Sequence, residues 1–232
     1  MTVDQALSTR DRILRAAAAL LQDGGRDAVS TRAVSAAAGV QAPALYRLFG
    51  DKDGLLDAVA SYGFEEYLGR KQELGETGDP VDDLRRGWDL HIQFGLTRPA
   101  FYALMYGEAR PGGPSPAARE AAAMLHGIIS RIAAAGRLKM SVERAAELTH
   151  STGVGVVLSL IAQPEAERDP EIPTVAREMV VRTITTGEAG PKSTVDLPAR
   201  AVALRAALTG DVPFSPAEQA LLGEWLNRLA DG

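Results

Sequence analysis

The sequence predicts an all-α protein. Apolar residues recur at the three- and four-residue spacing of helices along almost all of the 232-residue chain, and no segment alternates as a half-buried strand does. A capping side chain stands directly before proline at three places, which is typical of helix starts. These places are Asp79-Pro80, Ser115-Pro116 and Ser215-Pro216. We therefore expect a chain of about eleven helices.

The composition is that of an ordinary globular protein, with 46% hydrophobic and 24% charged residues. The absence of cysteine excludes disulfides, thiolate zinc sites and catalytic thiols. No apolar signal segment opens the chain, and the most apolar later stretch, Val154 to Ala162, is too short to span a bilayer. We therefore expect a cytoplasmic protein with no membrane contact.

The first helix is expected over the segment TRDRILRAAAALLQDGG, and two short helices follow it. Ser30 or Thr31 caps the second helix, and Gly39 ends it with a left-handed turn that other residues resist. Pro43 lies in the first turn of the third helix, where its missing N–H is not needed. Two short helices joined at a glycine corner predict a helix-turn-helix.

The third helix has the side chains that a helix in the major groove requires. Small residues allow close approach, while arginine can read guanine and glutamine can read adenine. Leu45 and Phe49 are expected to be buried together on the opposite face. Tyr46 and Lys52 suit phosphates, which position the protein without specifying sequence. The candidate DNA contacts are Thr31, Arg32, Gln41, Ala42, Pro43, Ala44, Tyr46, Arg47 and Lys52.

The net charge of −5 lies outside this region, because residues 1–60 hold seven Lys and Arg and seven Asp. Asp51 and Asp53 are placed to cap the helix that follows the motif rather than to approach DNA. We therefore expect few phosphate contacts, and tight binding only when two reading heads act together.

The segment from Arg10 to Val59 resembles the DNA-binding domain of the TetR family of dimeric, ligand-responsive transcriptional repressors. The resemblance rests on the opening helix and on the fragments TRAV, AAGV, ALYRLF and DKDGLL, in this order. Ser35 departs from a frequent alanine, and Leu48 departs from a common histidine that is a candidate phosphate contact. The resemblance implies a three-helix head with a helix-turn-helix at residues 1–60, followed by a helical ligand-binding and dimerisation domain at residues 61–232.

The rest of the chain is expected to be helical. Ser215 and Glu218 form a capping box at the start of the last helix. That helix is expected to close the core of its own subunit with one apolar stripe, and a part in dimer exchange is the alternative. The stripe consists of Leu221, Leu222, Trp225, Leu226 and Leu229. The expected helices cover residues 79–96, 99–107, 115–136, 141–162, 173–187, 197–208 and 215–230, with loops at 110–116 and 187–198.

Aromatic and polarisable side chains are concentrated between residues 79 and 107, where the resemblance implies a small-molecule cavity. Phe94, Phe101 and Met105 have core packing as the alternative, whereas Trp, His and Tyr bring polar groups that a purely structural site does not need. The candidate ligand-binding residues are Trp88, His91, Phe94, Phe101, Tyr102, Met105, Tyr106, Met124 and His150.

The sequence offers no basis for an enzyme. The three histidines fall on separate predicted helices with no ligand residue one turn away, so no metal site is predicted. There is no serine elbow, phosphate-binding glycine loop or HExxH motif. We therefore expect no cofactor and no catalytic residues.

A dimer interface is expected on two later helices. Ser151, Gly155 and Ser159 form a stripe of small residues. On the helix at 173–187, one face is expected to consist of Ala176, Met179, Val180, Thr183 and Ile184. Two such helices from each subunit would form a four-helix interface, as the resemblance implies; packing within one subunit is the alternative. A two-fold homodimer pairs two recognition helices with two half-sites, so its operator would be a palindrome.

We therefore predict a homodimeric transcriptional regulator that binds a palindromic operator in double-stranded DNA. The resemblance favours a repressor that a small, largely apolar effector releases. An activator, or a regulator without an effector, is the alternative within this class. From another class, the alternative is a helical enzyme or carrier whose helix-turn-helix is only a protein contact.

Overall fold

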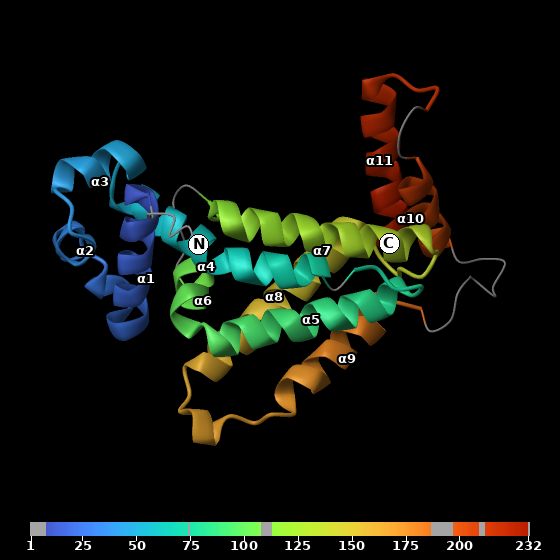
Figure 1. Ribbon diagram of the computed structural model, residues 1–232. Helices are drawn as coiled ribbons and strands as arrows, with labels where there is room; N and C mark the ends of the chain where they lie inside the picture. The colour runs from blue at the N-terminus through green and yellow to red at the C-terminus, as the bar shows by residue number, and fades with distance from the viewer. Residues whose placement is uncertain (1–7, 74, 108–112, 187–196, 209–211, 232) are drawn as a thin grey trace, which may run out of the picture. The chain divides into compact units, whose positions relative to one another are not determined.

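The computed structural model describes residues 8–73, 75–107, 113–186, 197–208 and 212–231 (Figure 1). These residues form eleven α-helices, a 3-10 turn at Glu165–Glu167 and no strand, apart from one isolated bridge between Leu138 and Thr185. The all-α prediction is therefore confirmed. The first six helices are α1 (Thr9–Ala28), α2 (Thr31–Ala38), α3 (Ala42–Phe49), α4 (Lys52–Glu73), α5 (Pro80–Thr97) and α6 (Pro99–Tyr106). The others are α7 (Pro116–Ala134), α8 (Val142–Ile161), α9 (Ile172–Ile184), α10 (Leu197–Ala207) and α11 (Pro216–Asp231).

The chain divides into two compact units, which share α5 and α7. Unit 1 comprises residues 1–73 and 94–120, and unit 2 comprises residues 74–93 and 121–232. Helices α1 to α4 and α6 therefore belong to unit 1, and α8 to α11 belong to unit 2. The functional boundary near residue 60 stays a prediction. Part of each expected loop, at 110–116 and at 187–198, lies outside the described residues.

The helix-turn-helix forms where the local signals place it. The Ser30 hydroxyl caps α2 by accepting a hydrogen bond from the Ala33 N–H at 3.1 Å. Gly39 ends α2 with φ 64° and ψ 40°, the left-handed conformation that glycine adopts without strain. Leu45 of α3 is fully buried. Phe49 is only half-buried, with the Arg10 guanidinium 5.9 Å from its ring centre, so the prediction that both side chains are buried is wrong for Phe49.

Helix α4 begins at a side-chain cap and then packs against α1 and α6. The Asp51 carboxylate accepts a hydrogen bond from the Gly54 N–H at 2.7 Å, as its predicted capping role requires. Gly63 marks the contact between α4 and α6. A Cβ atom at this position would lie 2.7 Å from Cγ of Phe101 and closer still to two other ring atoms, so only glycine lets the ring approach this far.

In unit 2, hydrogen bonds and ion pairs join α5 to α9. The Arg85 guanidinium donates to the Glu178 carboxylate at 3.1 Å and to Asp82 at 2.8 Å. The Trp88 indole N–H donates to the backbone carbonyl of Pro173 at 3.1 Å. These contacts fix the register between the two helices through groups of opposite polarity rather than through apolar packing alone.

A second polar cluster holds the start of α5. Asp83 is buried, and its carboxylate accepts hydrogen bonds from the Thr77 hydroxyl at 2.7 Å and from the Arg131 guanidinium at 2.8 Å. Burial alone would raise the pKa of Asp83, but these hydrogen bonds hold the pKa below its ordinary value. The buried charge is therefore compensated at both oxygens.

The last two helices, α10 and α11, pack against each other. The predicted capping box forms, because the Ser215 N–H donates to the Glu218 carboxylate at 2.8 Å and the Glu218 N–H donates to the Ser215 hydroxyl at 3.4 Å. Leu226 is buried, whereas the rest of the α11 stripe is exposed or half-buried. The expectation that the whole stripe closes the core is therefore wrong for Leu221, Trp225 and Leu229. None of the described helices has the length and apolar character needed to cross a bilayer.

Candidate DNA-binding surface and effector region

The candidate DNA contacts all lie at the surface of the helix-turn-helix. Six of them are exposed on or beside α2 and α3, and Lys52 is exposed at the first position of α4. Thr31 and Ala44 are half-buried. The exposed six are Arg32, Gln41, Ala42, Pro43, Tyr46 and Arg47. Their contacts with DNA stay predictions.

Local geometry leaves the functional groups of α3 available. Gln41 is the N-cap residue, but its side chain makes no capping hydrogen bond, and Pro43 lies in the first turn. Within the described residues, the side chains of Tyr46 and Arg47 form no hydrogen bond or ion pair, and half of the Tyr46 surface is exposed (50%). Leu48, which departs from the histidine common in the family, is 39% exposed beside them. The surface therefore combines one cation, one phenol and small apolar groups.

Ser35 of α2 lies behind this surface. Its hydroxyl oxygen is buried and has no hydrogen-bond partner. Burial of a hydroxyl without a partner costs free energy that an alanine at the same position does not lose. The buried Ser35 hydroxyl therefore lowers the stability of the head.

Three effector candidates of unit 1, Phe94, Tyr102 and Tyr106, form one aromatic cluster. Phe94, Phe101, Tyr102 and Met105 are buried and Tyr106 is half-buried. The ring centres of Phe94 and Tyr102 are 6.1 Å apart, and those of Tyr102 and Tyr106 are 4.8 Å apart. Such separations are typical of stabilising aromatic pairs. The cluster therefore joins the end of α5 to α6.

Two residues of α4 that the sequence reasoning missed extend this cluster. The ring of Tyr67 lies 5.0 Å from Phe94, and the ring of Phe64 lies 5.6 Å from Phe94 and 4.6 Å from Tyr67. Their three-residue spacing on α4 was the available signal, because it puts both rings on one face of the helix. Helix α4, which begins in the reading head, thus reaches the aromatic cluster.

The phenols of this cluster stay neutral. Burial raises the pKa of Tyr67 and of Tyr102, and the neighbouring phenol of Tyr106 raises both further. Burial also raises the pKa of Tyr106 to about 12. Neutral phenols donate or accept hydrogen bonds but carry no charge, so this region suits an uncharged polar group and disfavours a buried anion.

The remaining effector candidates, Trp88, His91, Met124 and His150, belong to unit 2. Trp88 is buried and His91 is half-buried, and both approach Gly153 of α8, where an added Cβ would lie 3.6 Å and 3.5 Å from their rings. Met124 and His150 are half-buried. Burial lowers the pKa of His150, although Glu147 opposes this shift. The structure thus sorts the predicted effector residues into two groups.

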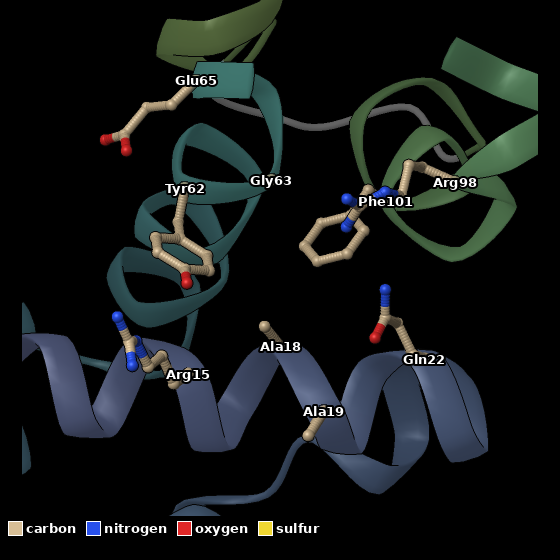
Figure 2. Close-up of a pocket in the computed structure, with 9 residues that line it drawn as sticks. All are labelled: Arg15, Ala18, Ala19, Gln22, Tyr62, Gly63, Glu65, Arg98 and Phe101. Atoms are coloured by element: carbon tan, nitrogen blue, oxygen red, sulfur yellow. The ribbon is translucent and has the colours of Figure 1, made fainter. Parts of the chain in front are cut away.

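Unit 1 also has a cavity of about 410 Å³, lined by residues of α1, α4 and α6 together with Arg98 (Figure 2). Phe101 is the one effector candidate that lines it. The other lining residues were missed because they come from three segments far apart in the sequence, and periodicity predicts the buried face of a helix but not the gaps between helices. Across the described residues, no group of His, Asp and Glu side chains has the arrangement of a metal site.

The faces expected at a dimer interface are partly exposed. Ser151, Gly155 and Ser159 of α8 are exposed, as an intermolecular contact requires. On α9 the expected face divides, because Val180 and Ile184 are buried within the chain whereas other members are exposed. The exposed face of α9 consists of Ile172, Val175, Met179 and Thr183.

Residues 13–59, from α1 into α4, match the family model of bacterial regulatory proteins, tetR family. A search of curated proteins found no match. Among solved structures, a putative tetR family transcription regulator from Shewanella sp. PV-4 is 18% identical, with a TM-score of 0.63 over 78% of this chain and 100% of that chain. The TetR family transcriptional regulator PfmR from Thermus thermophilus is 23% identical, with a TM-score of 0.55 over 80% of this chain and 100% of that chain.

A protein of unknown function from Rhodococcus sp. RHA1 is 26% identical, with a TM-score of 0.65 over 80% of this chain and 100% of that chain. The structural likenesses show a shared fold, and the family match covers the helix-turn-helix. The matched family consists of regulators rather than enzymes. The chain is therefore similar to TetR-family transcriptional regulators, because residues 13–59 match the family model and the likeness to solved structures shows a shared fold.

Proposed function

We propose that the protein is a homodimeric repressor that binds a palindromic operator through α3 and is released by a small, largely apolar effector. The observation that carries the proposal is the surface of α3, where Gln41, Tyr46 and Arg47 face solvent without intramolecular partners among the described residues. Arginine and glutamine at such positions read base edges in the major groove. Residues 1–60 are the reading head in this proposal, and residues 61–232 bind the effector and form the dimer.

The exposed face of α9 supports the proposed dimer. Ile172, Val175 and Met179 are 44%, 60% and 55% exposed along one side of the helix, and an exposed apolar patch of this kind is typical of an interaction surface. The small residues of α8 let a second helix approach closely. A two-fold dimer built on these helices would present two copies of α3 to successive major grooves, which requires a palindromic operator.

The aromatic cluster of unit 1 and the group around Trp88 support the proposed effector. Both combine buried aromatic surface with a few polar groups, which is the composition of small-molecule sites. An effector that binds better to a conformation with displaced heads lowers the affinity for DNA, and DNA lowers the affinity for the effector by the same factor. Helix α4 connects the two processes, since it begins beside α3 and its Tyr67 joins the cluster.

The experiment is an unbiased selection of bound duplexes with the full-length protein, followed by measurement of affinity for the selected sequence. Arg47→Ala should weaken specific binding by about 1 to 3 kcal/mol and leave the unfolding temperature nearly unchanged. Arg200→Ala is the matched control, because Arg200 is an exposed arginine of α10 and its loss removes the same charge. Equal losses in the two variants would show that Arg47 contributes only charge.

The salt dependence of duplex binding separates the alternative classes. A regulator binds DNA at low salt and loses affinity as salt rises, whereas a helical carrier or enzyme shows no affinity even at low salt. Screening small molecules for release from the selected duplex then distinguishes an effector-responsive repressor from a regulator without an effector. A cytoplasmic location is part of the proposal, because the operator lies on DNA.

A further inference from the structure

The cavity of unit 1 lies where the reading head meets α6, apart from the rings that form the core of the aromatic cluster. Its lining residues come from α1, from α4 and from the start of α6. Its volume of about 410 Å³ falls within the range of small-molecule sites. A molecule bound there would touch α1 and α4, which carry the helix-turn-helix, together with α6.

The floor of the cavity is apolar. Ala18 of α1 is 7% exposed, and Phe101 of α6 is packed against the Gly63 backbone. Figure 2 shows the Ala18 methyl group directed from α1 toward the space in front of the Phe101 ring. Because a Cβ at Gly63 would displace that ring, the floor also depends on a position where only glycine fits.

The rim of the cavity is polar and has an excess of positive charge. It holds Arg15 and Arg98 against the single carboxylate of Glu65, which points away from the Phe101 ring in Figure 2. Within the described residues, the side chains of Arg15, Tyr62 and Gln22 form no hydrogen bond or ion pair, so their donors are not used by the fold. Figure 2 shows the Gln22 amide directed toward the cavity.

We propose that this cavity binds a small amphipathic monocarboxylate, and that the bound molecule acts on the position of the reading head. The guanidinium group of Arg15 matches a carboxylate, to which it can donate two parallel hydrogen bonds. The apolar body of the ligand lies against Ala18 and the edge of Phe101. The effector of the proposed function would bind beside the neutral phenols of the aromatic cluster, which disfavour an anion. The monocarboxylate would bind in the cavity instead, so it is a second ligand at a second site.

The regulatory part of the inference rests on the proposed function. A ligand that contacts α1 and α6 at once favours the arrangement of these helices in which both contacts are made. If DNA binding favours a different arrangement, the ligand and DNA change each other's affinity by one common factor. The binding part needs no DNA and can be tested separately.

The test uses full-length protein, with 3-phenylpropionate as the probe and 3-phenylpropan-1-ol as its uncharged counterpart. Ligand-observed NMR titration measures both affinities for the wild type and for Arg15→Gln, Gln22→Trp and Arg12→Gln. Arg12 is the matched control, because it is also an exposed arginine of α1 but does not line the cavity. The duplex from the selection experiment is then titrated with and without the probe.

We expect the carboxylate to bind more tightly than the alcohol. Arg15→Gln should lower the affinity for the carboxylate by about tenfold, because it removes one charge-assisted contact. Gln22→Trp should abolish binding of both compounds because its side chain fills the cavity, and Arg12→Gln should change neither affinity. No binding at millimolar concentration, equal affinity for the alcohol, or indifference to both cavity variants would overturn the site. Binding of the probe without a change in duplex affinity would overturn the regulatory role, whereas failure of the untreated protein to bind any duplex would count against the proposed function alone.

Discussion

Replacement of Gly63 by alanine should test how tightly the reading head is fitted to α6. Carbon atoms in contact lie about 3.5 Å or more apart, so the new methyl group, 2.7 Å from Cγ of Phe101 and closer to the ring edge, requires a shift of roughly 1 Å. Phe101 is 1% exposed, so its rigid ring can make room only by displacing its neighbours or by moving into the cavity that it lines. Overpacking of this kind costs about 1 to 3 kcal/mol.

The intrinsic preference of helices opposes this cost. Alanine is favoured over glycine inside a helix by about 0.5 to 1 kcal/mol. We therefore expect Gly63→Ala to lower the free energy of unfolding by about 1 kcal/mol, as measured by urea denaturation followed by circular dichroism. Gly69→Ala on the same helix is the matched control, because an added Cβ meets no atom within 4 Å and should raise stability slightly.

A double-mutant cycle identifies the ring as the cause. In a Phe101→Ala background the clash is absent, so Gly63→Ala should become stabilising by about 0.5 to 1 kcal/mol. The coupling between the two positions is then about 2 kcal/mol. Equal effects of Gly63→Ala in both backgrounds, or a loss as large for Gly69→Ala, would refute the reasoning.

Three further predictions concern single residues. Ser35→Ala should raise the free energy of unfolding by about 1 kcal/mol, because it removes a buried hydroxyl without a partner; a lower unfolding temperature would reveal a hidden hydrogen bond. Tyr46→Phe should weaken binding to the selected and to a random duplex by similar factors, since the phenol is assigned to a phosphate; a loss confined to the selected duplex would assign it to a base. The pKa of Asp83 is held below its ordinary value of 3.8, so its contribution to stability is present above that pH and is lost as the pH falls through the lower folded-state value. Urea titrations at several pH values should show this loss in the wild type and a smaller one in Asp83→Asn; parallel profiles would remove Asp83 as the cause.

Helix starts were predictable because their signals are local. A capping side chain followed by proline placed the starts of α5, α7 and α11, and the glycine corner placed α3. Helix ends were harder. Helix α9 stops at Ile184, three residues before the expected end, because the next residue turns into extended backbone and the Lys139 N–H donates to the Ile184 carbonyl at 2.8 Å. Lys139 is remote from Ile184 in sequence, so no local pattern predicts this end of the helix.

The difference between local signals and contacts remote in sequence also explains which site residues could be predicted. The exposed side of α3 follows from its spacing, since Leu45 fixes the buried face. The stripe of α11 was correctly identified as apolar, but periodicity does not say how much of it the chain covers. The cavity of unit 1 depends on the meeting of Arg15, Tyr62 and Phe101, which stand on three helices. No spacing rule relates residues on three different helices, so the cavity can be identified only from the folded structure.

The indole of Trp88 gives this protein a built-in optical reporter. The chain has two tryptophans, of which Trp225 is 53% exposed, whereas Trp88 is 5% exposed and hydrogen-bonded to the Pro173 carbonyl. Trp225→Phe would leave Trp88 as the single tryptophan. Its emission wavelength and intensity depend on how far water reaches the junction between α5 and α9. Fluorescence of that variant can therefore record movement at this junction in real time, without any attached dye.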